Sequence, residues 1–281
     1  LLLAINASSK SLDLLDDAVT SISQSNSMNK AFLRKSSEEA QPDAPPLPSD
    51  PGKCANKRFA PTSATEKSRD FTDCVYNNPT KSTQNKGEAI YINTVKTALI
   101  CRNTRFHKCQ TTENGNGGAV YISTNSKNGA ELNTFDNCIF DSCKASAGGA
   151  VYCHTSATKA NKIQFRGCQF YHNEATSSAT PINTQRNGGG GALLISFVAS
   201  TIDDCIFNLN KAYHGSNILF CFSTTANTSD ALQVSKCQFW FESNGLGNRE
   251  SSIYMLKSTS KVVYSFTDNT FIGDADGENS F

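Results

Sequence analysis

The chain has 281 residues, and 26 Lys and Arg against 25 Asp and Glu leave a net charge of +1. This balance gives no electrostatic reason to expect a nucleic-acid partner or an anionic membrane surface. Apolar residues make up 38% of the chain, which is enough for a packed core and excludes full disorder, while abundant Asn, Ser and Thr argue against a helical bundle.

The N-terminal residues are apolar and lead to Asn6-Ala7-Ser8. Residues 1–7 are interpreted as the end of a secretory signal peptide with cleavage after Ala7, and the alternative is an ordinary N-terminus. Eleven cysteines also favour an oxidising, extracellular destination. The sequence has no apolar run near the ~20 residues of a membrane helix, so we expect no direct membrane insertion.

Residues 8–53 are expected to form a helical segment followed by a Pro-rich linker. Apolar residues recur at helical spacing from Leu12 to Ile22, which predicts one amphipathic helix over 11–36. The linker holds five of the eight prolines and is predicted to be extended. Those prolines are Pro42, Pro45, Pro46, Pro48 and Pro51.

A sequence element built on two glycines recurs between residues 117 and 194. Gly-Gly-Ala-Val-Tyr appears twice, and Gly-Gly-Ala-Leu-Leu follows as a modified copy. We expect each glycine pair to supply the positive φ angle of a tight corner. The pairs are Gly117 and Gly118, Gly148 and Gly149, and Gly190 and Gly191.

A second element, Cys-x-Phe, alternates with the first at a period near 30 residues. Its middle position holds Ile or Gln and must face outward, so the Cys and Phe face inward on a strand. Repeats too small to bury their own faces stack on one another. The sequence therefore predicts an all-β chain with a right-handed parallel β-helix of about six to seven coils over 54–281. The inward residues are Cys138, Cys168, Cys205, Cys237, Phe140, Phe170, Phe207 and Phe239.

In such a solenoid the phenylalanines stack as an aromatic column. Asn173 and Asn210 follow their Phe by three residues and are expected to bond adjacent coils at corners, as asparagine ladders do. The inward cysteines are interpreted as buried thiols in preference to disulfides, because stacked side chains point the same way. Cys54 and Cys74 are the better disulfide candidates.

The Gly-Gly-Ala-Val-Tyr and Phe-x-x-Asn elements resemble the repeat of the polymorphic outer-membrane-protein family, in the cysteine-bearing variant of protist surface proteins. Phe170 to Asn173 and Phe207 to Asn210 match the second motif, and Phe140 to Cys143 carries Cys in its last position. The resemblance covers roughly residues 87–275. It implies a β-helical passenger on a cell surface or secreted, often adhesive and without catalysis.

Metal and cofactor sites are not indicated. The four histidines lie far apart in sequence and form no metal-binding motif, so no cofactor is expected. Cys153 and His154 are neighbours on a predicted strand and point to opposite faces, which argues against a thiolate nucleophile. The remaining histidines are His107, His172 and His214.

The alternative is a carbohydrate-active β-helix of the pectate-lyase or polygalacturonase kind, or a glycan-binding module. Asp203, Asp204, His214 and Arg186 supply acidic and basic groups for such a site. Two adjacent acids on one strand diverge to opposite faces, and no companion motif appears at coil spacing. Asn227 lies in a glycosylation sequon.

We expect a non-catalytic, extracellular structural or adhesive module whose partners are copies of itself, or host or matrix glycans and proteins. The insertion at 176–189 is the expected variable contact loop. Solenoid ends need caps. The N-terminal segment is expected either to cap its own first coil or to reach another subunit, with the coils stacking into a filament.

Overall fold

The structure is a computed structural model of the whole chain. The residues that it describes are 32–35, 42–46, 54, 58–60, 68–77, 85–93, 98–124, 132–155, 162–178, 188–221, 231–241, 252–256 and 263–273. The signal-peptide interpretation, most of the predicted helix, Arg186 and Asn227 lie outside this part of the chain.

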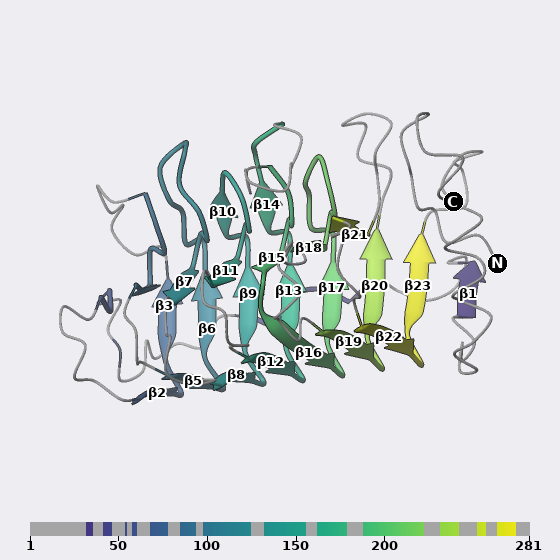
Figure 1. Cartoon of the computed structure of the whole chain (residues 1–281), viewed down its shortest axis with the longest axis horizontal. Coiled ribbons are helices and arrows are strands. Elements are labelled where there is room, and N and C mark those ends of the chain that lie inside the picture. The colour runs from purple at the N-terminus through teal and green to yellow at the C-terminus, as the bar shows by residue number, and fades with distance from the viewer. Residues whose placement is uncertain are drawn as a thin grey trace.

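Three parallel sheets run along the molecule, and successive strands of the chain pass from one sheet to the next (Figure 1). The eight-stranded sheet has, in spatial order, β1 (Phe32–Lys35), β23 (Thr270–Gly273), β20 (Gln238–Phe241), β17 (Ile206–Asn208), β13 (Gln169–Tyr171), β9 (Ile139–Asp141), β6 (Arg105–His107) and β3 (Val75–Asn77). The seven-stranded sheet has β2 (Ser68–Thr72), β5 (Ala98–Arg102), β8 (Leu132–Asp136), β12 (Lys162–Arg166), β16 (Ala199–Asp203), β19 (Ala231–Ser235) and β22 (Val263–Thr267).

The six-stranded sheet has β21 (Ile253–Leu256), β18 (Ile218–Cys221), β15 (Leu193–Ser196), β11 (Val151–Thr155), β7 (Val120–Thr124) and β4 (Ile90–Ile92). The short strands β10 (Lys144–Ala145) and β14 (Glu174–Ala175) pair with each other. Equivalent strands of successive coils pair in parallel, as Phe140 does with Phe170 and Val120 with Val151. This architecture confirms the predicted all-β parallel solenoid and is consistent with a right-handed β-helix.

The core lies inside the three sheets, because side chains alternate across each strand. In β12, Ile163 and Phe165 are buried, while Lys162 and Arg166 at the strand ends are exposed. The aligned positions of neighbouring strands repeat this pattern, so one continuous hydrophobic core extends through the coils.

The two glycines of each pair have different roles. Gly148 has a positive φ of 59°, as predicted. Gly149 does not, so the positive φ of the pair comes from its first residue. A Cβ on Gly149 would lie 2.1 Å from the carbonyl oxygen of Gly191 in the next coil. The second glycine therefore permits the close approach of adjacent coils. The other two pairs show the same division of roles, with positive φ at Gly117 and Gly190 and close backbone contact at Gly118 and Gly191.

The predicted helix over 11–36 is wrong at its C-terminal end, because residues 32–35 form strand β1. This strand pairs in parallel with β23, on the last coil of the solenoid, with Phe32 aligned to Thr270. The unpaired backbone groups of the β23 edge provide hydrogen bonds that outweigh a weak local helical pattern. Strand β1 is thus joined to the C-terminal coil, whereas the N-terminal segment was expected to cap the first coil or to reach another subunit.

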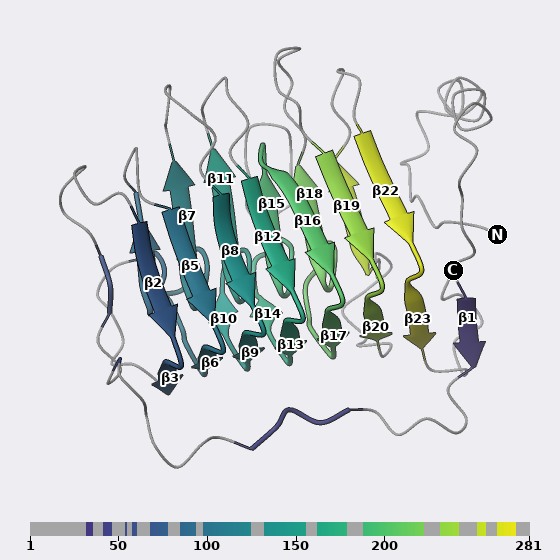
Figure 2. The ribbon, with the colours of Figure 1, turned by 90° about the horizontal axis from the view of Figure 1, so that it is seen from below.

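The Pro-rich segment continues from β1 toward the opposite end. Its described residues 42–46 lie along the outside of the eight-stranded sheet (Figure 2). The chain then reaches Cys54, which forms a disulfide with Cys74 beside β3. We call residues 36–53 the strap, since they connect β1, at one end of the eight-stranded sheet, to the chain that enters β3 at the other end.

Candidate functional site

Each coil turns at corners where one residue has positive φ and the next side chain points to the neighbouring backbone. The first corner joins the seven-stranded to the eight-stranded sheet, and the second follows the eight-stranded sheet. The residues after the positive-φ position are Cys74, Thr104, Cys138, Cys168, Cys205, Cys237 and Asn269 at first corners, and Cys109, Cys143, Asn173 and Asn210 at second corners. A corner thus accepts Cys, Thr or Asn.

The structure places Asn173 and Asn210 in a ladder at second corners, fully or almost fully buried. The side-chain oxygen of Asn173 accepts a 3.0 Å hydrogen bond from the backbone N–H of Cys143, and its Nδ2 donates to the carbonyl of Phe140. Asn210 bonds in the same way to the N–H of Asn173 and the carbonyl of Phe170. These bonds hold one coil to the next.

The cysteines are equivalent to the asparagines as donors. The Cys168 thiol donates to the carbonyl of Phe135 in the preceding coil at 3.2 Å, and also to the carbonyl of Arg166, two residues earlier, at 3.4 Å. Cys138, Cys205 and Cys237 occupy the same position in their coils and are free and buried. Burial raises the pKa of the Cys138 and Cys205 thiols well above the usual value. These thiols are buried within the core of the solenoid.

The phenylalanines of the Cys-x-Phe element form a continuous stack. The ring centroids of Phe140 and Phe170 are 4.9 Å apart, those of Phe170 and Phe207 are 4.7 Å apart, and those of Phe207 and Phe239 are 4.9 Å apart. The ring planes are within 8° of parallel. This spacing is that of paired strands, so the strand register itself sets the stack.

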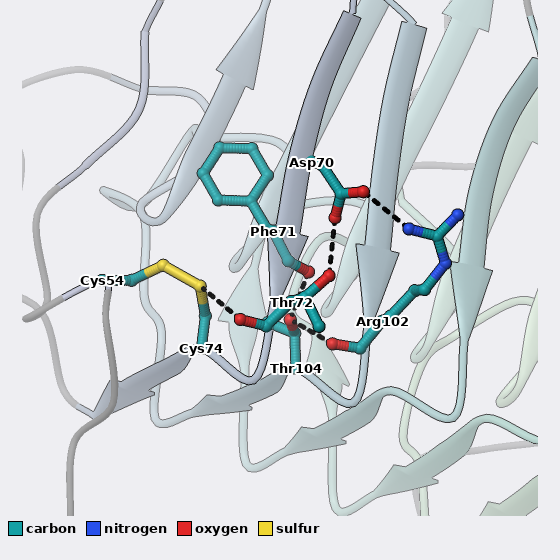
Figure 3. The surroundings of a disulfide bond; sticks show 7 residues. All are labelled: Cys54, Asp70, Phe71, Thr72, Cys74, Arg102 and Thr104. Atoms are coloured by element: carbon teal, nitrogen blue, oxygen red, sulfur yellow. Dashed lines mark hydrogen bonds and ion pairs between the residues drawn. A yellow bond between two sulfur atoms is a disulfide. The ribbon is translucent and has the colours of Figure 1, made fainter.

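Charged side chains form a second ladder on the outside of the seven-stranded sheet. Arg102 aligns with Asp136, and Asp136 aligns with Arg166 of the next strand. Arg166 in turn aligns with Asp203. The guanidinium of Arg102 lies 2.6 Å from Asp70, and that of Arg166 lies 2.9 Å from Asp136. Opposite charges directly across a strand pair favour this register, whereas a one-residue shift would turn these charged side chains toward the core. The Arg102–Asp70 pair lies close to the Cys54–Cys74 disulfide at the first coil (Figure 3).

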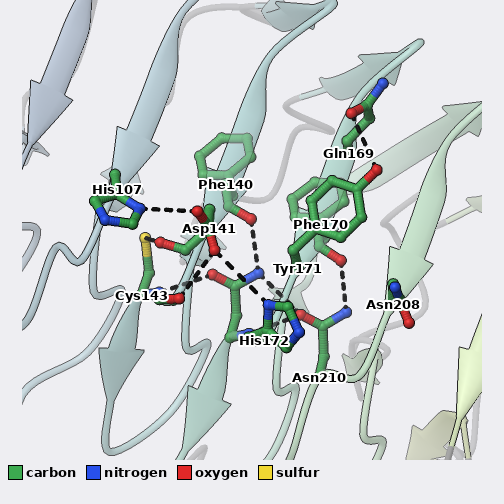
Figure 4. A network of polar contacts seen from close by, with 12 residues as sticks. His107, Phe140, Asp141, Cys143, Gln169, Phe170, Tyr171, His172, Asn208 and Asn210 are labelled. Atoms are coloured by element: carbon green, nitrogen blue, oxygen red, sulfur yellow. Dashed lines mark hydrogen bonds and ion pairs between the residues drawn. The ribbon is translucent and has the colours of Figure 1, made fainter. Parts of the chain in front are cut away.

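A polar cluster lies on the outer face of the eight-stranded sheet, centred on Asp141 of β9 (Figure 4). His107 of β6 is aligned with Asp141, and its Nδ1 lies 2.8 Å from the carboxylate. Arg105 of the same strand donates to Asp141 at 3.1 Å, and Ser142 donates to it at 2.9 Å. His172 approaches the other carboxylate oxygen at 3.8 Å. These groups form one network around a single carboxylate.

The network stabilises the ionised form of Asp141. Burial raises the pKa of its carboxyl group, but the favourable interactions with His172, Ser142 and His107 outweigh this effect and hold the pKa well below the usual range. Arg105 and Asp141 are each only 6% exposed. The pair is therefore charged and withdrawn from solvent, which requires good geometry on both sides.

The strap lies over this cluster. The guanidinium of Arg105 donates from Nη1 to the carbonyl oxygens of Pro45 and Pro46, the latter at 2.9 Å. Farther along the same face, Nδ2 of Asn208 donates to the carbonyl of Pro42 at 2.6 Å. Asp141 thus orients an arginine that binds the strap backbone, so the chemistry of this cluster is recognition of carbonyl groups.

The residues considered for carbohydrate chemistry lie at separate positions. Asp203 belongs to the charge ladder and accepts a 2.7 Å hydrogen bond from Ser235, whereas Asp204 is a positive-φ corner residue. His214 is buried beside Tyr254. Cys153 is buried, which raises the pKa of its thiol to about 12. Within the described residues, no group of three or more His, Cys, Asp or Glu side chains has an arrangement suited to a metal ion.

Sequence reasoning did not find the Arg105–Asp141 pair. It considered His107 and His172 as metal ligands and indicated no partner for either. The usable signal was that Arg105 and His107 flank an inward Phe106, and Asp141 directly follows Phe140. Side chains flanking an inward Phe point outward, and the period aligns them across adjacent coils.

No helix in the described part of the chain is long and apolar enough to cross a membrane. Comparison with protein-family models, with curated proteins and with solved structures finds no match to this chain.

Proposed function

We propose that the protein is a non-catalytic, extracellular structural or adhesive module that assembles with copies of itself end to end. The observation that carries this proposal is the use of its polar groups. Asn173 and Asn210 bond coils together, Arg102 and Asp136 pair across strands, and Asp141 holds the arginine that binds the strap. The groups best suited to catalysis are thus engaged in maintaining a rigid rod.

The disulfide between Cys54 and Cys74 supports an extracellular location, since such bonds persist in oxidising compartments. The nine other cysteines are all buried, where they are protected from oxidation. A rod with a protected thiol interior and one disulfide near its end is suited to exposure outside a cell. Localisation on intact cells, with an antibody that does not enter them, tests this part of the proposal.

A glycan-binding face is the second candidate. The outer face of the seven-stranded sheet carries amide and hydroxyl side chains in one register row, namely Gln164, Thr201, Gln233 and Ser265. Successive members lie about 4.8 Å apart, so they offer repeated hydrogen-bonding groups to an extended polymer. Gln233 and Ser265 are exposed.

Binding and turnover assays distinguish these functions. The purified protein is applied to acidic and neutral polysaccharides, with and without calcium, and both retention and chain cleavage are measured. The structural proposal predicts no cleavage. Retention that is lost on Gln233→Ala, but not on Arg69→Ala in the first coil, favours glycan binding by the row. Cleavage that is lost on Asp204→Ala supports an enzyme and contradicts the proposal.

A further inference from the structure

We propose that the edge of β23 paired with β1 is a strand-acceptor site whose occupant in an assembly is strand β1 of a second copy. This inference rests on the end-to-end assembly proposed above and identifies the joint between two copies. Within one chain, β1 and β23 are paired over four residues although 234 residues lie between Lys35 and Thr270. The other edge of β23 is occupied by β20, so β1 takes the one that is left.

The end of the solenoid at which β1 lies has an open core among the described residues. Tyr264 of β22 aligns with Leu232 of β19. Leu232 is fully buried, whereas Tyr264 is 48% exposed and its neighbour Val263 is 57% exposed. Phe266 and Phe271 are only partly buried against the core. An exposed apolar surface bounded by strand edges is typical of an interaction site.

The opposite end of the molecule has the matching geometry. It presents β2 and β3, the first strands of two of the three sheets, whereas Phe59 bridges to Ile90 at the edge of β4, and all strand pairing in these sheets is parallel. A second copy stacked head to tail therefore continues the seven-stranded and eight-stranded sheets in the same direction. Such a heterologous contact joins two different surfaces and leaves a free end, so it extends into a filament.

The strap allows β1 to change partners. Its 18 residues span at most ~60 Å when extended, and the crossing from β1 to β3 over seven strand spacings needs only about 34 Å. In a head-to-tail stack, the strap of the second copy begins at its own Cys54, close to the junction. Its β1 therefore reaches β23 of the first copy over a shorter path than the one it follows within its own chain.

The described contacts of the strap do not oppose this exchange strongly. They are side-chain hydrogen bonds from Arg105 and Asn208 to proline carbonyls, and a proline has no N–H with which to pair as a strand. The exchanged β1 strand forms the same backbone hydrogen bonds with β23 of the other copy that it forms with β23 of its own chain, so the exchange costs little free energy. The tether favours its own β23 at low protein concentration, and a second copy competes when the concentration is high.

The test uses two variants that each add one cysteine, Phe32→Cys and Thr270→Cys. The two new thiols stand at aligned positions of β1 and β23. Chains with tags of different size are co-expressed, concentrated and treated with a short bifunctional thiol reagent. The native free thiols are buried, and the wild-type chain serves as the control for their reactivity. The double variant shows that the aligned pair reacts within one folded chain.

Strand exchange predicts a covalent dimer containing one chain of each tag, at least tenfold above the yield when Thr270→Cys is replaced by Gln233→Cys, which is exposed on another sheet. A mixture that stays monomeric while the double variant reacts internally overturns the strand-exchange proposal. Light scattering on the same sample separates the two proposals. If scattering shows filaments, end-to-end assembly stands without exchange, and if it shows monomers, both fail.

Discussion

The side-chain oxygen of Asn210 accepts a hydrogen bond from the backbone N–H of Asn173 at 3.0 Å, and the Nδ2 of Asn173 also donates to that oxygen at 2.9 Å. The two residues are 37 positions apart in the chain and adjacent in space. A buried amide thereby satisfies backbone groups of the preceding coil that are hidden from water, which is why a corner residue of this type contributes to coil stacking.

Asn173→Ala is expected to lower the free energy of unfolding by about 2–4 kcal/mol, because it leaves buried groups of Cys143 and Phe140 without partners. Asn173→Cys is expected to cost less than Asn173→Ala, since Cys143 occupies the same corner one coil earlier and donates to a carbonyl there. Urea denaturation measures both variants. Gln233→Ala, at an exposed site, is the control, and an equal loss in all three variants contradicts the ladder.

Phe170→Ala is expected to lower the free energy of unfolding by about 3–5 kcal/mol, because it removes a fully buried ring stacked on both sides. Phe271→Ala, at the last described position of the column and only partly buried, is expected to cost less. Denaturation of both variants measures the difference. If Phe271→Ala lowers the free energy of unfolding as much as Phe170→Ala does, burial of the ring on both sides adds no stability to the column.

Gly149→Ala and Gly167→Ala separate close approach from backbone strain. The new Cβ at Gly149 would lie 2.1 Å from a backbone oxygen of the adjacent coil, which cannot move away independently. At Gly167, with φ of 57°, it would meet only the side chain of Asn137. We expect Gly149→Ala to prevent folding or cost more than about 3 kcal/mol, and Gly167→Ala to cost about 1–2 kcal/mol. Thermal melts rank the two variants by stability. A larger loss for Gly167→Ala than for Gly149→Ala would contradict the close-approach role of Gly149.

The Asp141 network predicts a specific dependence of stability on pH. The pKa of the Asp141 carboxyl is lower in the folded chain than in the unfolded chain, so the unfolded state binds more protons as the solution becomes acidic. The stabilisation is present above the ordinary carboxyl pKa near 4 and decreases as the pH falls below it. Asp141→Asn is expected to be less stable than the wild type at pH 7, with a gap that narrows toward pH 3. Denaturation at each pH measures it, and a constant gap contradicts the network.

The thiols are expected to be unreactive in the folded protein. An aromatic disulfide reagent at pH 8 should modify none of the nine free cysteines, because they are buried and, for thiols such as Cys153, burial raises the pKa to about 12. The same reagent in denaturant should modify all nine. Rapid modification of the folded chain would show that the thiol column opens to solvent.

The sequence was sufficient to predict the solenoid because its signals are local and periodic. Phe140 and Phe170 lie one period apart in equivalent motifs, and parallel stacking is the arrangement that aligns them. The same reasoning predicted the Cys54–Cys74 disulfide, which the structure confirms. It did not predict the Arg105–Asp141 cluster, because no motif marks the pair and alignment across coils was applied only to inward residues.

The repeat alone determined that this chain coils, which side chains face inward and where its corners lie, since strand alternation and tight turns depend on residues close together in the chain. Only the tertiary structure decided where the N-terminal segment goes. The helical pattern before Phe32 is local, whereas the unpaired edge of β23 exists only after every coil has folded, so its hydrogen bonds to β1 appear in no stretch of the sequence.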